Sequence, residues 1–335
     1  MEHFISYKDA CKIIGLSLVL ALALVSSTAY SQKGMPMKSV QQGLASIKPV
    51  ISLSGAALTP PTMGEDTRKR LEENLAKAQA AYDANPDDLE NIIWLGRRTS
   101  YLWGYHEAIG IYTEGLRKFP DNYKLLRHRG HRYISVRAFD KAIADLERAT
   151  ELIEGVQDHV ELDGAPNKYN IPTSSNHFNI WYHLGLAYYL VGDFENALRC
   201  YEKNKDFVYN YDALVANTDW LYMINRRLGR EQEAMAVLAP VRNDMNILEN
   251  DAYFKRILMY KGEITPEELL DLSGGSDLAN ELNLVTQGYG VANWYLYNGQ
   301  AEEAQVLFKR IVDNPYWSAF GYIAGEAELN PKSVP

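Results

Sequence analysis

The histidines are the residues whose type and spacing could do chemistry. His128 and His131 are three residues apart, so on a helix they share one face, and His183 occupies a comparable position further along the chain. Two neutral imidazoles and a carboxylate such as Glu90 or Asp219 could bind zinc, and an open fourth position would make the site catalytic. No His-Glu-x-x-His motif and no paired cysteine spacing accompanies them. The sequence therefore favours histidines that stack and form hydrogen bonds within a polar groove.

Catalytic signatures of other kinds are absent from the sequence. It contains no Gly-x-Ser-x-Gly elbow, no Gly-x-x-x-x-Gly-Lys-Ser/Thr phosphate loop and no Gly-x-Gly-x-x-Gly following a strand. Cys200 falls among residues that face a helical core, where a thiol is usually a small inert hydrophobe. We therefore expect a binding protein with no cofactor and no metal. The alternative is a metal-dependent or small-molecule-processing protein that uses the histidines.

The first 29 residues have the order of a secretory signal peptide. Lys8 and Lys12 precede an apolar run over residues 13–25, and small residues follow this run. The run is too short to span a bilayer comfortably, and cleavage after either Ala29 or Ser31 would remove it. We expect an exported protein, periplasmic or extracellular, with no stable membrane insertion after signal cleavage. An uncleaved anchor is the alternative.

Charge and composition narrow the class of partner. The formal net charge is −9 and the chain has no extended run of Lys and Arg, so nucleic acid is not an expected partner. Only Cys200 would remain after cleavage, so no internal disulfide can form and packed apolar surface must stabilise the fold. Residues 30–65 contain several prolines and no sustained helical period, which predicts a flexible linker.

A repeated pattern is clearest between residues 178 and 201. Leu184 and Tyr188 lie on one helical face, while Gly185 and Ala197 are small enough for two helices to approach closely. The full set of patterned residues is Phe178, Trp181, Leu184, Gly185, Tyr188, Gly192, Phe194, Ala197 and Tyr201. This spacing resembles the tetratricopeptide repeat, a motif of about 34 residues made of two antiparallel helices.

The same frame recurs along the chain. Helical end pieces are also expected, at Thr67–Ala84 and around Trp317, because an outermost repeat would otherwise expose its apolar face. The resemblance implies an all-α, right-handed α-solenoid of tetratricopeptide-type helix pairs over residues 66–330, with no sheet. Repeats are expected near residues 89–122, 123–154, 178–211, 215–245 and 285–314, with a cryptic helix pair over 249–272.

In proteins of that family, the first helix of each repeat usually lines a concave groove that binds the ligand. The corresponding positions here are rich in Arg, His and aromatic residues, which are the usual anchors of binding surfaces. We expect them to be exposed and to bind a protein or peptide partner, with a locally basic groove favouring an anionic one. Alanine at Arg127 and His131 should leave melting nearly unchanged. The candidate residues are Trp94, Arg97, Tyr101, Arg127, His128, His131, Tyr182, His183, Trp220 and Arg227.

Residues 155–177 interrupt the repeats. The segment mixes turn formers such as Pro166 and Pro172 with acidic residues, and it cannot continue either neighbouring helix. Its acids lack the Asp-x-Asp-x-Asp-Gly alternation of a calcium-binding loop. Insertions in a solenoid often lie on the binding face, so we expect this loop to fold against the groove.

Overall fold

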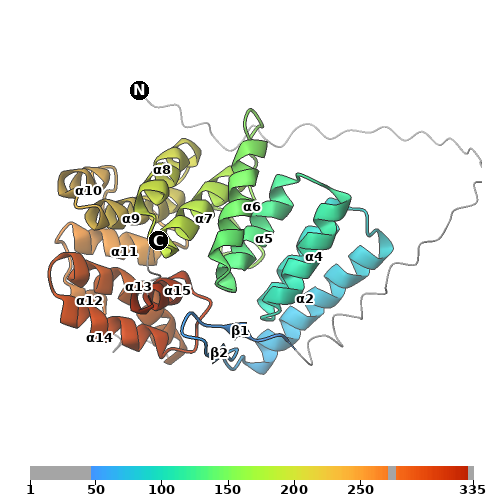
Figure 1. Ribbon diagram of the computed structural model, residues 1–335, viewed down its shortest axis with the longest axis horizontal. Coiled ribbons are helices and arrows are strands. Elements are labelled where there is room, and N and C mark those ends of the chain that lie inside the picture. The colour runs from blue at the N-terminus through green and yellow to red at the C-terminus, as the bar shows by residue number, and fades with distance from the viewer. Residues whose placement is uncertain (1–46, 271–276, 331–335) are drawn as a thin grey trace, which may run out of the picture. The chain divides into compact units, whose positions relative to one another are not determined.

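The chain folds as a series of antiparallel helix pairs. A computed structural model describes residues 47–270 and 277–330, so the expected signal peptide and the first part of the expected linker lie outside the described residues. Each helix from α2 to α9 packs against the next one in the chain (Figure 1). The helices of this part are α2 (Glu65–Ala84), α3 (Leu89–Tyr101), α4 (Tyr105–Lys118), α5 (Tyr123–Ser135), α6 (Phe139–Leu152), α7 (Asn176–Leu190), α8 (Phe194–Asn204) and α9 (Tyr211–Arg227).

Small residues on the first helix of each pair let the second helix approach closely. A Cβ atom added to Gly185 would lie 2.6 Å from the ring of Tyr201, and one added to Gly130 would lie 2.7 Å from the side chain of Leu146. Ala197 on α8 is fully buried. The small residues identified in the sequence therefore lie at helix contacts, and the α-solenoid of helix pairs is confirmed.

The turn inside each pair needs a left-handed backbone. Gly192 and Gly229 have φ angles of 81° and 70°, which glycine adopts without a steric penalty. Trp103 and Arg137 hold the same kind of turn in the first two pairs, with φ angles of 69° and 63°. A bulky side chain in this region costs about 1–2 kcal/mol, so other contacts must offset the strain.

The C-terminal helices fold back toward the middle of the chain. The last helix packs against α13 and α14 and also reaches α7 (Figure 1), so it does more than cap the array. Within the described residues no helix is long and apolar enough to cross a membrane. The helices of this part are α10 (Glu231–Val237), α11 (Asp251–Tyr260), α12 (Pro266–Leu269), α13 (Asp277–Tyr297), α14 (Ala301–Val312) and α15 (Phe320–Leu329), while the 3₁₀ turn η2 (Lys205–Phe207) lies earlier, between α8 and α9.

Part of the segment expected to be a flexible linker is instead a small hairpin. Strand β1 (Val50–Ile51) pairs antiparallel with β2 (Ala57–Leu58), and both strands precede the helical region over residues 66–330 for which no sheet was expected. Two hydrogen bonds fix the hairpin to the C-terminal region: Trp317 Nε1 donates to the Thr59 carbonyl at 2.9 Å, and the Leu53 N–H donates to Glu326 Oε1 at 2.5 Å. These partners are far apart in sequence, so local pattern carries no sign of them.

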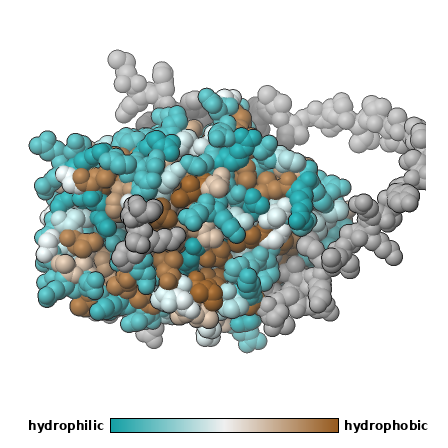
Figure 2. All heavy atoms as spheres, viewed as in Figure 1, coloured by the Kyte–Doolittle hydropathy of each residue, from teal (hydrophilic) through white to brown (hydrophobic). Residues whose placement is uncertain are grey.

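One large hydrophobic cluster joins the middle and C-terminal helices. It includes the fully buried aromatic side chains of Tyr201, Trp220 and Tyr289, while α3 and α4 share a smaller cluster around Leu95 and Tyr112. On the face drawn in Figure 2, hydrophobic residues lie among hydrophilic ones across the middle of the molecule. Packed apolar surface therefore links the early repeats to helices much later in the chain.

Candidate functional site

The residues expected to line an open groove are largely covered. Two later segments lie over them: the insertion that follows α6, and the C-terminal helix α15. This corrects the expectation that all ten are exposed. Half-buried side chains are those of Trp94, Arg97, Tyr101, His131 and Arg227, and buried ones are those of Arg127, His128, Tyr182, His183 and Trp220.

Half of the candidate residues meet at one basic pocket between α3 and α5. Its volume is about 110 Å³. Besides Glu161 it contains three arginines, so its formal charge is positive although the chain as a whole is acidic. Arg132 was missed by the sequence analysis; it follows His128 by one helical turn, which places both on the same face. The pocket is lined by Arg97, Ser100, Tyr101, Tyr112, Arg127, His128, His131, Arg132 and Glu161.

Arg127 is the most deeply placed cation of this pocket. Its Nη2 lies 3.1 Å from Glu161 Oε1, with both side chains 9% exposed, and its Nη1 lies 2.9 Å from His128 Nδ1. Its Nε is buried and has no hydrogen-bond partner within the described residues. Burial lowers the pKa of Arg127 and Glu161 opposes that effect. Alanine at Arg127 would leave the Glu161 carboxylate buried without its ion-pair partner. The substitution should therefore destabilise the fold, contrary to the expectation of unchanged melting.

Burial decides the protonation of the neighbouring histidine. It lowers the pKa of His128 well below its ordinary value, and the charge of Arg127 adds to the effect. A neutral imidazole can accept a hydrogen bond from Arg127 at Nδ1, which is the atom that faces the guanidinium. His128 also stacks on Tyr112, with ring centroids 5.7 Å apart. The ring therefore orients Arg127 in the pocket.

The insertion lies against the first helices, as expected. Arg97 Nη1 donates to the Leu162 carbonyl at 2.8 Å, and Arg98 Nη1 donates to the Gly164 carbonyl at 2.7 Å. A Cβ atom at Gly164 would overlap the hydroxyl group of Tyr101, so a larger residue would require the tyrosine side chain or the segment to move. The sequence analysis also missed Arg98, because the family's groove position on this helix is the neighbouring residue, Arg97.

His131 and His183 pack against Phe320 of the C-terminal helix, and His131 also lines the basic pocket. Their ring centroids are 4.2 Å apart, and the Phe320 ring lies 5.5 Å from His131 and 5.7 Å from His183. His183 Nδ1 is 2.5 Å from the Asn179 carbonyl. Within residues 47–270 and 277–330, no group of three or more His, Cys, Asp or Glu is placed to hold a metal ion.

The carboxylates considered as zinc ligands have partners elsewhere. Glu90 pairs with Lys124 at 2.8 Å near the surface. Asp219 is fully buried, lies 2.5 Å from Arg256 Nη2 and accepts a hydrogen bond from Tyr260. The two carboxylates named for the zinc hypothesis, Glu90 and Asp219, are therefore paired with other residues.

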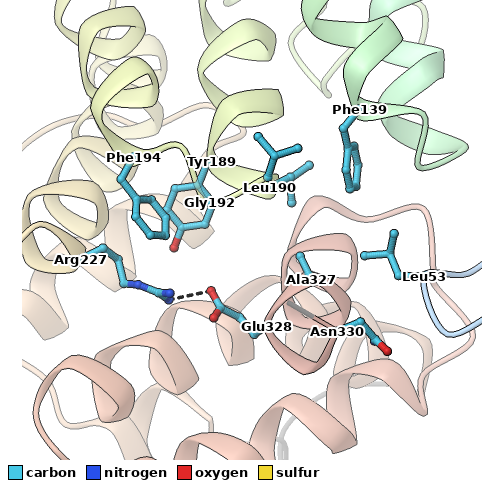
Figure 3. A pocket seen from close by; sticks show the side chains of 11 residues that line it. Leu53, Phe139, Tyr189, Leu190, Gly192, Phe194, Arg227, Ala327, Glu328 and Asn330 are labelled. Carbon is cyan, nitrogen blue, oxygen red and sulfur yellow. Dashed lines mark hydrogen bonds and ion pairs between the residues drawn. The ribbon is translucent and has the colours of Figure 1, made fainter. Parts of the chain in front are cut away.

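The remaining candidate residues belong to other clusters. Trp220 Nε1 donates to the hydroxyl group of Tyr182 at 2.7 Å inside the core. Arg227 lines a second pocket of about 210 Å³ between the end of α7 and α15 (Figure 3), where its guanidinium pairs with Glu328 at 2.6 Å. These three residues stabilise the contact between distant helices and do not extend the basic pocket.

Comparisons with known proteins agree with the repeat pattern. No family model matches the chain. A curated relative, the small glutamine-rich tetratricopeptide repeat-containing protein 2 of Saccharomyces cerevisiae, is 25% identical over 154 residues, which are 46% of this chain and 38% of that protein. Solved structures that resemble the chain include a tetratricopeptide repeat protein from Parabacteroides merdae (14% identity, TM-score 0.44, covering 78% of this chain and 94% of that one). Another is YrrB, titled a TPR protein with an unusual peptide-binding site (14% identity, TM-score 0.38, covering 75% and 97%).

Proposed function

We propose that this tetratricopeptide-repeat protein is an interaction scaffold that binds an acidic peptide segment of a protein partner on the first helices α3, α5 and α7. The observation that carries the proposal is the set of groups that these helices present to a peptide chain. Arg97 and Arg98 donate to main-chain carbonyls, and Arg127 pairs with a carboxylate. Groups that recognise both the backbone and an acidic side chain suit an extended acidic segment.

Charge and aromatic surface support the same partner class. The basic pocket has three arginines and one carboxylate on a chain with a net charge of −9, so an anionic group is drawn to this face locally. Trp94 lies beside the pocket, and the guanidinium groups of Arg97 and Arg98 lie 4.5 and 4.8 Å from its ring centre. A rigid aromatic surface next to hydrogen-bond donors is the usual composition of a binding hot spot.

The proposal is for a scaffold and not for an enzyme. In the metal-dependent alternative the histidines would converge on an ion, whereas His131 and His183 stack on each other and His183 Nδ1 is next to a carbonyl group. Export of the protein is a further part of the proposal, and it rests on the order of residues 8–31 in the sequence alone.

Site-specific photocrosslinking tests the binding face. A benzophenone amino acid replaces Trp94 on α3 in one variant and the exposed Arg117 of α4 in the control, and both are expressed in the native cells. We expect partner adducts from position 94, with the crosslinked peptide rich in Asp or Glu by mass spectrometry. Equal adducts from both positions, or adducts from position 117 alone, would place partner binding on another surface.

A further inference from the structure

We infer that residues 160–164, here called the internal segment, occupy the partner-binding face as a tethered ligand that an acidic peptide must displace. The inference rests on the proposed function and names how that same site is controlled. The internal segment belongs to the insertion after α6, and its contacts reach helix α3, which lies about 65 residues earlier in the chain. It is therefore a segment from elsewhere in the sequence that lies on this face.

The internal segment is held as a bound peptide would be held. Its carbonyl groups at Leu162 and Gly164 accept hydrogen bonds from two arginines of α3. Its carboxylate, Glu161, pairs with Arg127 of α5 and accepts a hydrogen bond from Asn179 Nδ2 of α7 at 3.1 Å. Three first helices thus contact three residues of the internal segment, Glu161, Leu162 and Gly164, through polar groups.

In the internal segment the charged side chain is buried and its apolar neighbours are exposed, which is the reverse of the usual arrangement. Glu161 is 8% exposed, whereas its apolar neighbours Val160 and Leu162 are 52% and 63% exposed. A loop that folded by burying apolar surface would show the opposite arrangement. Its position is therefore set by the polar groups of the binding face, as it would be for a ligand.

A partner carboxylate could satisfy Arg127 better than the internal segment does. Glu161 contacts only Nη2, which leaves the buried Nε of Arg127 without a hydrogen bond in the described chain. A carboxylate that approached Nε and Nη2 together would make the bidentate pair that arginine prefers. An unsatisfied buried donor is unfavourable, so this geometry favours exchange of Glu161 for a partner's acid.

Acidic groups next to the internal segment also favour its release. Asp163 has a buried carboxylate oxygen, Oδ2, with no hydrogen-bond partner in the described residues. Burial and the nearby Glu249 raise the pKa of Asp163 to about 6, so at neutral pH the segment has a charge that its surroundings disfavour. The start of the internal segment is also held by the insertion itself, since Val160 bridges to Ser175 and the Glu161 N–H donates to the Ser174 carbonyl. The Asn176 N–H at the start of α7 donates to the His159 carbonyl, which lies outside the segment, so the Glu161 side chain and residues 162–164 can leave the binding face without unfolding α7.

Binding of the internal segment in trans tests the inference. The probe is a fluorescent, end-capped peptide with the sequence of residues 158–166, titrated by anisotropy against the full chain. Glu161→Gln weakens the internal contact, and Gly164→Ala releases the segment independently by the clash with Tyr101. Glu154→Gln is the control, because it makes the same charge change at an exposed position just before the insertion.

We expect the probe to bind the two release variants at least about tenfold more tightly than the wild type or the control, because a tethered ligand competes at a millimolar effective concentration. Adding Arg127→Gln to Gly164→Ala should abolish this gain. Melting curves show which variants are folded, and one folded release variant is enough for the test. Equal affinity for all four proteins, or no binding to a folded release variant, would overturn the inference.

The outcomes separate this inference from the proposed function. Adducts from position 94 without binding of the probe to the release variants would support the scaffold function and contradict the tethered ligand. Tight binding of the probe to the release variants without any adduct from position 94 would support the internal competition and contradict the binding of a protein partner at this face.

Discussion

Arg137 and Glu326 form a buried ion pair, with Nη2 and Oε2 2.8 Å apart and side chains only 3% and 4% exposed. Arg137 lies in the strained turn between α5 and α6, and Glu326 belongs to α15. The same arginine donates to the Trp317 carbonyl at 2.8 Å. Trp103, the other bulky residue with a left-handed turn, packs its ring 5.2 Å from that of Trp317. Both strained turns therefore contact one tryptophan that fixes the C-terminal region.

Loss of this pair should destabilise the whole fold. Arg137→Ala leaves the carboxylate of Glu326 buried, and breaking a buried pair on one side costs about 3–5 kcal/mol. The free energy of unfolding is measured by urea denaturation. Arg148→Ala is the matched control, since its partners Asp121 and Glu151 are exposed and its loss should leave the curve almost unchanged. Equal effects of the two substitutions would show that the pair does not join the repeats to α15.

The close helix contact at Gly185 should not tolerate a methyl group. Gly185→Ala places Cβ 2.6 Å from the Tyr201 ring, so overpacking should lower the free energy of unfolding by about 1–3 kcal/mol. The same change at Gly110 of α4 meets no atom within 4 Å. Because alanine is the better helix former, Gly110→Ala should stabilise the protein by up to about 1 kcal/mol. Thermal denaturation of both variants checks the opposite signs, and a stabilising Gly185→Ala would contradict the assigned packing.

Acidification below about pH 6.5 should destabilise the fold through its buried histidines. Burial, with repulsion from nearby arginines, holds the pKa values of His128, His131 and His183 well below the ordinary value. The folded state therefore stays unprotonated at pH values where the unfolded chain takes up protons. Each such histidine lowers the free energy of unfolding by up to about 1.4 kcal/mol per pH unit in this range.

Urea denaturation between pH 7 and pH 5 measures this dependence. His131→Gln removes one titrating group and should reduce the slope by that group's own share, up to about 1.4 kcal/mol per pH unit. Burial also lowers the pKa values of His106 and His177, so the other histidines keep part of the slope. His159→Gln, on the exposed part of the insertion, is the control. An unchanged slope for His131→Gln would mean that this ring takes up its proton in the folded state.

Export predicts a defined new N-terminus. Protein recovered from its native compartment should begin at Tyr30 or Gln32, because small residues precede both cleavage positions. Sequencing of the purified N-terminus checks this. An intact Met1 on protein from a cytoplasmic fraction would contradict export.

The helix pairs could be predicted from the sequence because their determinants are local. The spacing of Leu184, Gly185 and Tyr188 specifies one face of a helix, and Gly192 supplies the left-handed turn that follows. Family positions also identified five of the nine residues that line the basic pocket, since neighbouring first helices place equivalent residues together. The family's groove positions did not include Arg98 or Arg132. Arg98 lies next to the groove position Arg97, and Arg132 lies one helical turn after the groove position His128, so only the structure showed that they reach this face.

The sequence predicted that the insertion lies against this face, but only the tertiary structure decided which of its residues do so and that α15 covers the face as well. Glu161 lies in an insertion without periodicity, so nothing in the sequence indicates that it meets Arg127. Phe320 reaches His131 and His183 only because α15 folds back onto α7. Sequence periodicity specifies which face of a helix is apolar, but contacts between residues far apart in the chain depend on how the whole array packs. The sequence by itself therefore determined the repeat and its basic first helices, and the packing of distant segments determined that this face is occupied.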